Sequence, residues 1–447
     1  MTTKQNTVLA PEWLWTPEGL RTGWAVEIGP TGHIVQLLAP DRQPRDAEHL
    51  PGRLLLPAMV NAHSHAFQRA FRGQVQWRST GDDTFWTWRD RMYGVANALS
   101  PEGVEAVSRL AFLEMAEAGF GAVGEFHYLH HQPDGTRYAD PDELARRVLA
   151  AAAAVGIRIC LLRVVYQAAR DDQRRFGDRS PDEALAALAR LPGAVGLAPH
   201  SVRAVPAAWM PTLATWQGVV HAHVSEQQAE NAQCHAVTGG SPLRLLASHG
   251  LVSSRFSAVH LTYPLAGDLE LLLGADAGVV VCPSTELDLG DGFLPLDVRE
   301  TARMSIGTDS QARIDPWAET RDLELHGRGL AGRRNVLAPP GDRHGLAERL
   351  LNAGSRAGSR ALGFDDRGIA VGAPADLVAL DLRRPGALGV PPLEAAAFVA
   401  TPEWVDALWV GGRPVVRGGH HPDREAIVAG ARPFLTPRRD DPEATSA

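Results

Sequence analysis

Short apolar runs recur through the middle of the chain and alternate with helical patterns. The runs occupy residues 54–62, 121–126, 157–166, 194–199, 219–224, 256–261, 277–283 and 304–308. Apolar runs of this length, separated by helices, are typical of parallel strands that are buried on both faces. Eight of them predict an α/β fold, a (β/α)8 TIM-like barrel over residues 54–367. A doubly wound open sheet is the competing topology, but no GxGxxG motif follows an early strand.

Three of the intervening helices have clear starts in the sequence. Ser100, Asp140 and Ser180 each precede a proline, and a glutamate follows Asp140 and Ser180 three residues later. This is the pattern of an N-cap side chain with proline in the first turn. Gly119 and Gly156 are predicted to end two of the helices.

Both ends of the chain differ from the middle in their sequence pattern, because they contain short strand-like runs and turns. Residues 1–53 contain two such runs around the Pro30-Thr31-Gly32 turn, and in residues 368–420 the Gly411-Gly412 pair separates two more. Apolar runs around such turns are typical of hairpins. We therefore predict that 1–53 and 368–420 pair into one small β domain. Residues 421–447 are rich in Pro, Arg and Asp and are expected to form a loosely ordered C-terminal tail.

The composition excludes several classes of function. The chain has 447 residues and a formal net charge of −8, so no basic field suggests a nucleic-acid partner. No run of 18 apolar residues predicts a membrane span, and no signal peptide is recognisable. Three cysteines, distant in sequence, indicate a reduced, cytoplasmic protein without disulfides.

Lysine is almost absent from the chain. Lysine and arginine together number 44, and the single lysine is Lys4, in the polar N-terminal segment. This argues against Schiff-base chemistry and against the lysine of phosphate-binding loops. It also excludes a binuclear metal centre bridged by a modified lysine.

Ionisable residues collect where the predicted strands end, which in a β/α barrel is the side of the active site. His63 and His65 follow the first run, and because strand side chains alternate, both face the same way. His223 and Asp309 end other strands. Three imidazoles and one carboxylate suit one zinc ion, with iron or manganese as alternatives.

Further polar residues lie at the same predicted edge. Glu226, three residues after His223, is either a solvated charge or a carboxylate that reaches a metal-bound water. His260 ends the sixth run and is either a site residue or a hydrogen-bonded core histidine. His221 forms a second HxH pair with His223, but we expect it to lie in the core.

Two arginines are candidates for binding an anionic substrate. Arg203 follows His200 at the end of the fourth run, and Arg89 lies in an aromatic-rich insertion after the first. Arginine binds carboxylates through two parallel hydrogen bonds. With so many arginines in the chain, a solvated surface role is the alternative for each. We expect Phe85, Trp86 and Trp88 to belong to the core or to anchor the insertion.

At these residues the chain resembles the amidohydrolase superfamily. LLLPAMVNAHSH, HAHVSE and SIGTDS are similar to the metal and catalytic motifs of its first, fifth and eighth strands. GIAVGAPADLVALD and VDALWVGGRPVV look like the segments that close its small β domain. AHSHAFQRAFRG, DDTFWTWRDRMY, GAVGEFHYLHH, PHSVRAV and STELDLGDG narrow the resemblance to the formiminoglutamate deiminases.

The resemblance implies a zinc-dependent deiminase of histidine degradation that converts N-formimino-L-glutamate to N-formyl-L-glutamate and ammonia. It implies one divalent metal ion per subunit, a small dicarboxylate substrate and a homodimer. The implied metal ligands are His63, His65, His223 and Asp309; the catalytic residues are Glu226, His260 and Asp309; and the substrate-binding residues are Gln68, Arg89, Tyr128, His200 and Arg203. Gln311 departs from the family pattern, which has histidine there.

Two other functions fit parts of this pattern. A deaminase of a purine, pyrimidine or triazine ring would use the same metal site, but it would need an apolar slot for the ring and few cations at its mouth. A barrel retained only as an interaction scaffold would be expected to have lost the metal ligands, whereas all four are present.

Overall fold

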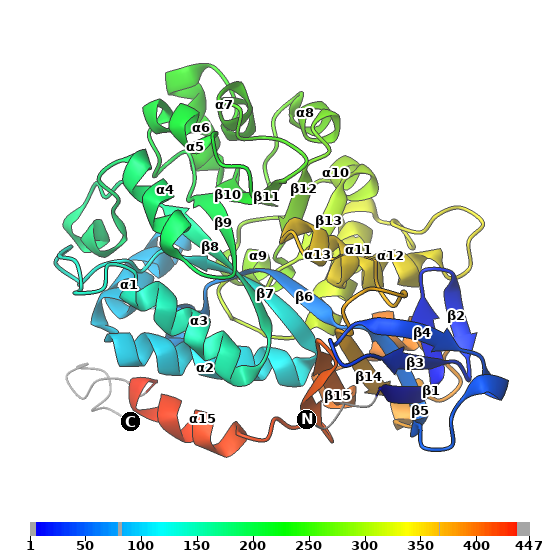
Figure 1. Cartoon of the computed structure of the whole chain (residues 1–447). Helices are drawn as coiled ribbons and strands as arrows, with labels where there is room; N and C mark the ends of the chain where they lie inside the picture. Colours follow the sequence, from blue (N-terminus) through cyan, green and yellow to red (C-terminus); the bar gives the residue numbers. More distant parts are fainter. Residues whose placement is uncertain (1–5, 79–82, 366, 436–447) are drawn as a thin grey trace.

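The computed structural model describes residues 6–78, 83–365 and 367–435. Lys4 and residues 436–447 of the predicted tail lie outside the described residues. The described chain forms a nearly closed eight-stranded parallel barrel surrounded by helices, with a separate, mostly antiparallel sheet beside it (Figure 1). This confirms the predicted α/β fold class, a TIM-like barrel with a small β domain.

The barrel strands follow one another in sequence order, and every neighbouring pair is parallel. Their bounds are β6 Met59–Ser64, β7 Phe120–His127, β8 Arg158–Val165, β9 Ala194–Pro199, β10 Val220–Val224, β11 Phe256–His260, β12 Gly278–Val281 and β13 Arg303–Ile306. A parallel bridge between Ser64 and Asp309 joins the first strand to the segment after the last one. The barrel is therefore closed at the edge where the predicted site residues lie.

Helices surround the barrel, between its strands and after the last of them. Their bounds are α1 Phe85–Ala98, α2 Pro101–Ala118, α3 Glu143–Val155, α4 Pro181–Arg190, α5 Met210–Leu213, α6 Gln228–Thr238, α7 Pro242–Ser248, α8 Asp268–Gly274, α9 Pro283–Leu289, α10 Leu296–Thr301, α11 Pro316–Ala331, α12 Gly345–Gly354 and α13 Arg356–Ala361. Both α1 and α2 lie between β6 and β7, so the first connection is longer than one helix.

Most of the predicted helix ends are confirmed. The Oγ atoms of Ser100 and Ser180 accept the backbone N–H three residues on, at 3.1 and 3.2 Å, as N-caps do. Gly119 and Gly156 end α2 and α3 with positive φ values of 103° and 86°. The prediction for Asp140 is wrong, because its carboxylate accepts the N–H of Asp142 in a turn before α3 begins.

Replacing Ser100 by alanine should lower the free energy of unfolding by about 1 kcal/mol, the usual contribution of an N-cap side chain. The substitution leaves the N–H of Gly103 without its side-chain acceptor at the start of α2. Urea unfolding of the two proteins measures the difference. Ser100→Asp is the control, because aspartate caps equally well and should keep the wild-type stability.

The small sheet combines strands from both ends of the chain. Its strands are β1 Thr7–Thr16, β2 Gly19–Thr22, β3 Ala25–Ile28, β4 Ile34–Leu38, β5 Glu48–Pro57, β14 Leu377–Asp381, β15 Val405–Val410 and β16 Arg413–Arg417. Strand β5 pairs with β1 on one side and β14 on the other, which joins the two ends. Leu9, Leu14 and Trp409 are among the residues of its separate buried core.

Two predictions near these borders need correction. The apolar run 54–62 is not one strand: Leu54–Leu56 belong to β5 of the small sheet, and barrel strand β6 starts at Met59. The run is continuous in sequence because both strands are buried.

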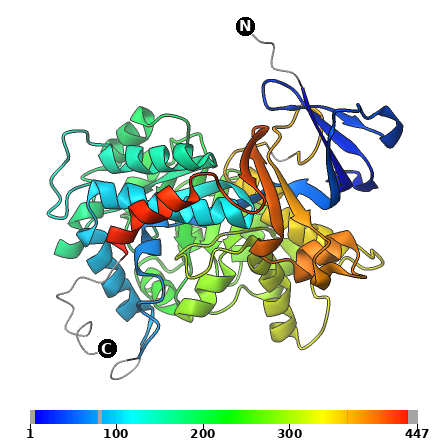
Figure 2. The same cartoon turned by 90° about the horizontal axis from the view of Figure 1, so that it is seen from below.

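The predicted tail is partly ordered, since α15 (Arg424–Ala431) lies along α2 (Figure 2), where it buries Ile427. Within the described ranges, no helix is long and apolar enough to cross a membrane.

Candidate metal centre and active site

The hydrogen bonds that close the barrel also bring the first metal-ligand candidates together. The N–H of Asp309 donates to the carbonyl of His63, and the N–H of His65 donates to the carbonyl of Asp309, both at 3.0 Å. Asp309 adopts a φ of +45°, which a non-glycine residue rarely does. Such backbone strain persists where the surrounding structure enforces it, often at functional sites.

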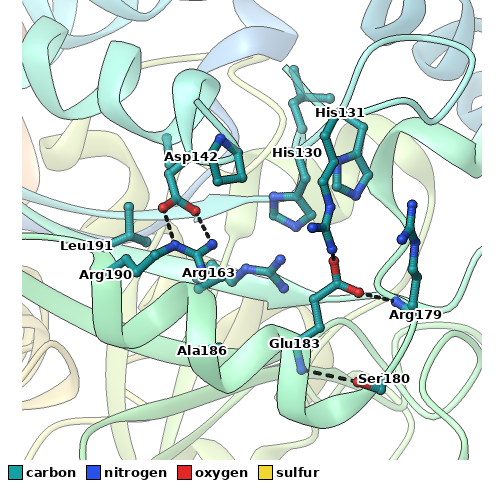
Figure 3. Close-up of a pocket in the computed structure, with 15 residues that line it drawn as sticks. His130, His131, Asp142, Arg163, Arg179, Ser180, Glu183, Ala186, Arg190 and Leu191 are labelled. Carbon is teal, nitrogen blue, oxygen red and sulfur yellow. Dashed lines mark hydrogen bonds and ion pairs between the residues drawn. The ribbon is translucent and has the colours of Figure 1, made fainter. Parts of the chain in front are cut away.

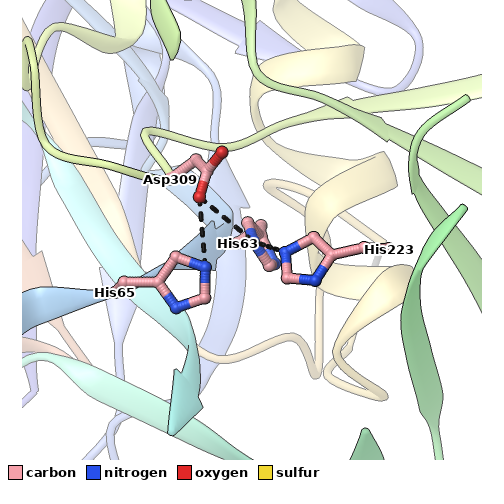
Figure 4. Close-up of side chains that lie close together, drawn as sticks. All are labelled: His63, His65, His223 and Asp309. Atoms are coloured by element: carbon pink, nitrogen blue, oxygen red, sulfur yellow. Dashed lines mark hydrogen bonds and ion pairs between the residues drawn. The ribbon is translucent and has the colours of Figure 1, made fainter. Parts of the chain in front are cut away.

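Four side chains from three strand ends converge on one point inside the barrel mouth (Figure 4). One ligand atom from each of His63, His65, His223 and Asp309 lies within 4.8 Å of the others, and all four residues are buried. The Nε2 atoms of His63 and His65 lie 3.4 and 3.2 Å from Oδ1 of Asp309. The Nε2 atoms of His63 and His223 lie 3.2 Å apart. Lone pairs this close suit a shared cation.

Neighbouring backbone groups prepare these imidazoles to bind a metal. The Nδ1 atoms of His65 and His223 lie 3.0 Å from the carbonyl oxygens of Phe126 and His200, to which they donate. This leaves each Nε2 unprotonated and directed at the cluster. Burial lowers the pKa of His63 to about 3, so this ring is neutral at physiological pH. The donor set therefore fits one divalent ion.

A second group, His260 with Cys282 and Asp309, has ligand atoms equally close together. Cys282 is buried, and burial together with Asp309 and other carboxylates raises the pKa of its thiol well above the usual value. This second group offers three ligand atoms, one of them from Asp309, whereas the first group offers four. The His63, His65, His223 and Asp309 set is therefore the better metal site.

His260 and Glu226 lie next to the four-residue cluster, near Asp309. The Nε2 of His260 lies 3.5 Å from Oδ2 of Asp309 and 3.8 Å from Oε1 of Glu226, and its Nδ1 lies 3.4 Å from Glu286. Burial disfavours the imidazolium, but the three carboxylates outweigh it and raise the pKa of His260 to about 10. Its Nε2 is therefore a hydrogen-bond donor that faces the site.

A cavity of about 130 Å³ opens onto this cluster, and all five predicted substrate-binding residues line it. They are Gln68, Arg89, Tyr128, His200 and Arg203. The amide of Gln68 donates to the hydroxyl of Tyr128 at 3.1 Å, so these two side chains form one wall. The predicted residues thus come from several separate strand ends and one helix.

Arg203 is already paired within the cavity. Its Nη2 lies 2.5 Å from Oε2 of Glu226, and its Nε lies 3.7 Å from Oε1 of Glu230. Glu230, on α6, is buried and also accepts the N–H of Glu226 at 3.1 Å. Burial would lower the pKa of Arg203, but the two glutamates raise it further above its ordinary value. The arginine therefore remains charged and links the cavity wall to Glu226.

Arg89 is held differently. Its guanidinium lies over the ring of Trp86, 4.5 Å from the centroid, and within 5.7 Å of that of Tyr93. In the described parts of the chain it forms no ion pair with a carboxylate, and its Nε has no hydrogen-bond partner. Stacking holds the group in place and leaves its N–H donors available to a ligand.

Helix α1 contributes more to the cavity than the sequence analysis foresaw. Phe85, Trp88, Arg89, Met92 and Tyr93 all line it from this helix. Their spacing of three and four residues is that of one helical face, a signal that was available in the sequence. The aromatic cluster is thus partly a cavity wall. Tyr166 and Gln173 also line the cavity and were not predicted.

Gln311 belongs to a buried hydrogen-bond network next to the metal-ligand candidates. Its Nε2 donates to Oγ of Ser64 at 2.9 Å, and that hydroxyl donates to Glu125 at 2.6 Å. Glu125 also accepts the N–H of Ala66 at 2.7 Å, so the network holds the backbone on both sides of His65. Burial raises the pKa of Glu125 to about 7.

His221, the other histidine of the second HxH pair, points away from the cluster. Its Nε2 lies 2.8 Å from the carbonyl oxygen of Ala361, and the residue is completely buried. Burial lowers the pKa of His221 to about 4. It is a core histidine, as expected from the sequence.

Comparison with known proteins agrees with this geometry. Residues 54–415 match the model of the amidohydrolase family. The formimidoylglutamate deiminase of Pseudomonas aeruginosa is 37% identical over 431 residues, which cover 92% of this chain and 94% of that enzyme. A solved amidohydrolase from Brucella melitensis superposes with a TM-score of 0.88 at 33% identity, over 96% of this chain and 99% of the other.

A second solved structure is an adenosine deaminase from Xanthomonas campestris with bound zinc. It has a TM-score of 0.81 and 25% identity, with 96% of this chain and 97% of that one covered. The family match spans most of the chain, and the relative from Pseudomonas aeruginosa is similar over nearly its whole length. The chain belongs to the amidohydrolase family.

Proposed function

We propose that this protein hydrolyses N-formimino-L-glutamate to N-formyl-L-glutamate and ammonia, a step of histidine degradation. As an amidohydrolase it is a hydrolase that acts on C–N bonds. The observation that carries the choice of substrate is the cavity beside the metal-ligand cluster, which two arginines line. The similarity to the deiminase from Pseudomonas aeruginosa supports the same choice.

The metal that we propose is one zinc ion per subunit, held by His63, His65, His223 and Asp309. The three converging imidazoles, the buried carboxylate and the zinc in the Xanthomonas campestris structure support this. When bound, the ion supplies a water nucleophile that is activated at neutral pH.

The residues around this point are suited to move the protons of the reaction. Oδ2 of Asp309 lies near Nε2 of His260, so His260 can hold the attacking water while the carboxylate takes its proton. Glu226, whose Oε1 also lies near Nε2 of His260, can deliver a proton to the departing nitrogen. The bond between the formimino carbon and its terminal nitrogen then breaks. The oxygen of the water stays on the carbon as the formyl carbonyl, both of its protons end on the terminal nitrogen, and ammonia leaves in place of an amide ion.

Substrate orientation follows from the arginines. In our proposal Arg89 and Arg203 bind the two carboxylates of the glutamate moiety, and Gln68, Tyr128 and His200 add hydrogen bonds. Arg203 is shared with Glu226, so a substrate carboxylate must replace or join that glutamate at the guanidinium. Glu226, which delivers the proton, and Arg203, which binds the substrate, are therefore in contact.

A ring deaminase is the alternative, because Phe85, Trp88 and Tyr93 could stack on a purine or pyrimidine. The scaffold alternative is set aside by the family match and the complete ligand set. To separate the remaining two, kcat/KM of the metal-replete protein should be measured with formiminoglutamate, adenosine, guanine and cytosine. We expect turnover of formiminoglutamate and little of the rings. Preference for a ring would overturn the proposal.

Replacing Arg89 by methionine should lower kcat/KM for formiminoglutamate roughly ten- to a hundredfold, since a charge-assisted hydrogen bond contributes about 1.5–3 kcal/mol. The metal content should not change, because Arg89 lies outside the ligand cluster. Steady-state kinetics and metal analysis of the same preparation give both results.

Arg91→Met is the matched control for this substitution. Arg91 lies on the same helix and stacks on Trp77, but it does not line the cavity. It should keep wild-type kinetics. If Arg89→Met turns over formiminoglutamate as efficiently as the wild type, Arg89 does not bind a substrate carboxylate.

A further inference from the structure

A second cavity, of about 480 Å³, lies between α3 and α4 on the outer side of the barrel (Figure 3). It shares no lining residue with the substrate cavity. The two are separated by the segment after β7, where Tyr128 faces the substrate cavity and Leu129 and His130 line the second one. Its volume is in the range of sites that hold small metabolites.

The lining of this cavity carries excess positive charge. Four arginines line it against two acidic residues, Asp142 and Glu183. Asp142 is paired with Arg190 at 2.7 Å, and Glu183 is paired with Arg137. Arg163 is paired with Asp178, at 2.5 Å, behind the wall.

Arg179 is the fourth arginine of the lining and belongs to none of these three ion pairs. Its backbone N–H donates to Glu183, and its charge is one of the causes that lower the pKa of that carboxyl, but within residues 6–78, 83–365 and 367–435 its guanidinium has no carboxylate at ion-pair distance. A guanidinium at the edge of a cavity, with no carboxylate at ion-pair distance, can bind an anionic group through two hydrogen bonds.

His130 adds a hydrogen-bond acceptor to the same cavity. Only 6% of this residue is exposed, and its Nε2 donates to the carbonyl of Val164 at 3.0 Å. Its Nδ1 therefore carries the lone pair of the neutral ring and is the nitrogen that can accept a hydrogen bond. Burial and the nearby Arg163 hold the pKa of His130 well below its usual value, so the ring stays neutral. A neutral Nδ1 accepts a hydrogen bond from a ligand O–H or N–H.

Part of the cavity lining is aliphatic. Leu129, Ala187 and Leu191 line the cavity beside these polar groups. A ligand that fills the space therefore needs a short apolar body as well as an anionic group and a donor.

We infer that this cavity is a second binding site, for a small carboxylate that carries a hydroxyl or amino group on the adjacent carbon and a short aliphatic body. Arg179 binds the carboxylate, the Nδ1 of His130 accepts the hydroxyl or amino proton, and the aliphatic body lies against Leu129, Ala187 and Leu191. This site does not depend on the proposed reaction, because none of its residues touches the metal-ligand cluster.

The test is calorimetric titration of the metal-replete protein with three probes of matched shape: 4-methylpentanoate, 2-hydroxy-4-methylpentanoate and leucine. We expect saturable binding of at least one of the last two, about tenfold or more tighter than that of 4-methylpentanoate, which lacks the donor. Arg179→Gln should weaken this binding by a similar factor and leave turnover unchanged. The control Arg174→Gln removes an exposed arginine that pairs with Asp171 and does not line the cavity. It should bind like the wild type.

Three results would overturn the inference. One is the absence of saturable binding of any probe. Another is equal affinity for the probe that lacks the donor, which would leave His130 without a role. The third is binding that survives Arg179→Gln but is lost in Arg203→Met, because the probes would then occupy the substrate cavity.

Discussion

Alanine in place of Asp309 should abolish turnover and lower the metal content of the purified protein. The carboxylate is the only acidic member of the four-residue cluster, and its two oxygens face different groups: Oδ1 the histidines and Oδ2 His260. In our proposal its removal takes away a ligand and a proton acceptor together. His63→Ala and His223→Ala should behave in the same way, because each removes one of the converging imidazoles. Elemental analysis and ammonia release measure the two effects.

Asp322→Ala provides the control for this experiment. Asp322 pairs with Arg313 at 2.7 Å, away from the ligand cluster. Its loss should alter neither metal content nor turnover. An Asp309→Ala protein that is fully active and metal-replete would contradict the assignment of the metal site.

Glu226→Gln should retain the metal and the fold but lose most of the turnover. The amide can still accept a hydrogen bond from Arg203, whereas it cannot carry the proton that the departing nitrogen needs. General acid–base groups contribute about 10²–10⁴-fold, so kcat should fall by a factor in that range. Single-turnover kinetics together with metal analysis separate this loss from a loss of the ion.

Glu230→Gln is the matched variant, because Glu230 lies near the same arginine but does not line the cavity. We expect it to lose less activity than Glu226→Gln. A loss of less than about threefold in Glu226→Gln would exclude this residue as the proton carrier, given the usual contribution of such groups.

The barrel and the metal-ligand cluster could be predicted from the sequence because both follow from local rules. Apolar runs between capped helices identify the strands, and strand alternation directs His63 and His65 to one side. Because a β/α barrel gathers the carboxyl ends of its strands, His223 and Asp309 could be expected nearby although they are distant in sequence. The structure brings these four together.

The contacts within the site could not be predicted in this way. The pair between Arg203 and Glu226 depends on how the loops after two strands pack, and no sequence period encodes it. The network of Gln311 and Glu125 likewise joins residues that meet only when the barrel closes. The division of the run 54–62 between two sheets depends on pairing with β14, which lies more than 300 residues later.

Some predictions from the sequence concern properties that the structure of a single chain without ligands does not test. The homodimer and the cytoplasmic location stay predictions, as does the division of the dicarboxylate between Arg89 and Arg203. The last of these can be tested with an analogue that lacks one carboxylate. One of the two arginine variants should then show little further loss with that analogue.

The products of hydrolysis test the central claim most directly. Metal-replete protein should be incubated with N-formimino-L-glutamate, and ammonia and the carbon products should be quantified by enzymatic assay and NMR spectroscopy. We predict one ammonia for each N-formyl-L-glutamate, because water attacks the formimino carbon and the terminal nitrogen leaves. Release of formamide and glutamate in place of ammonia, or no turnover by protein that contains its metal, would contradict the proposed function.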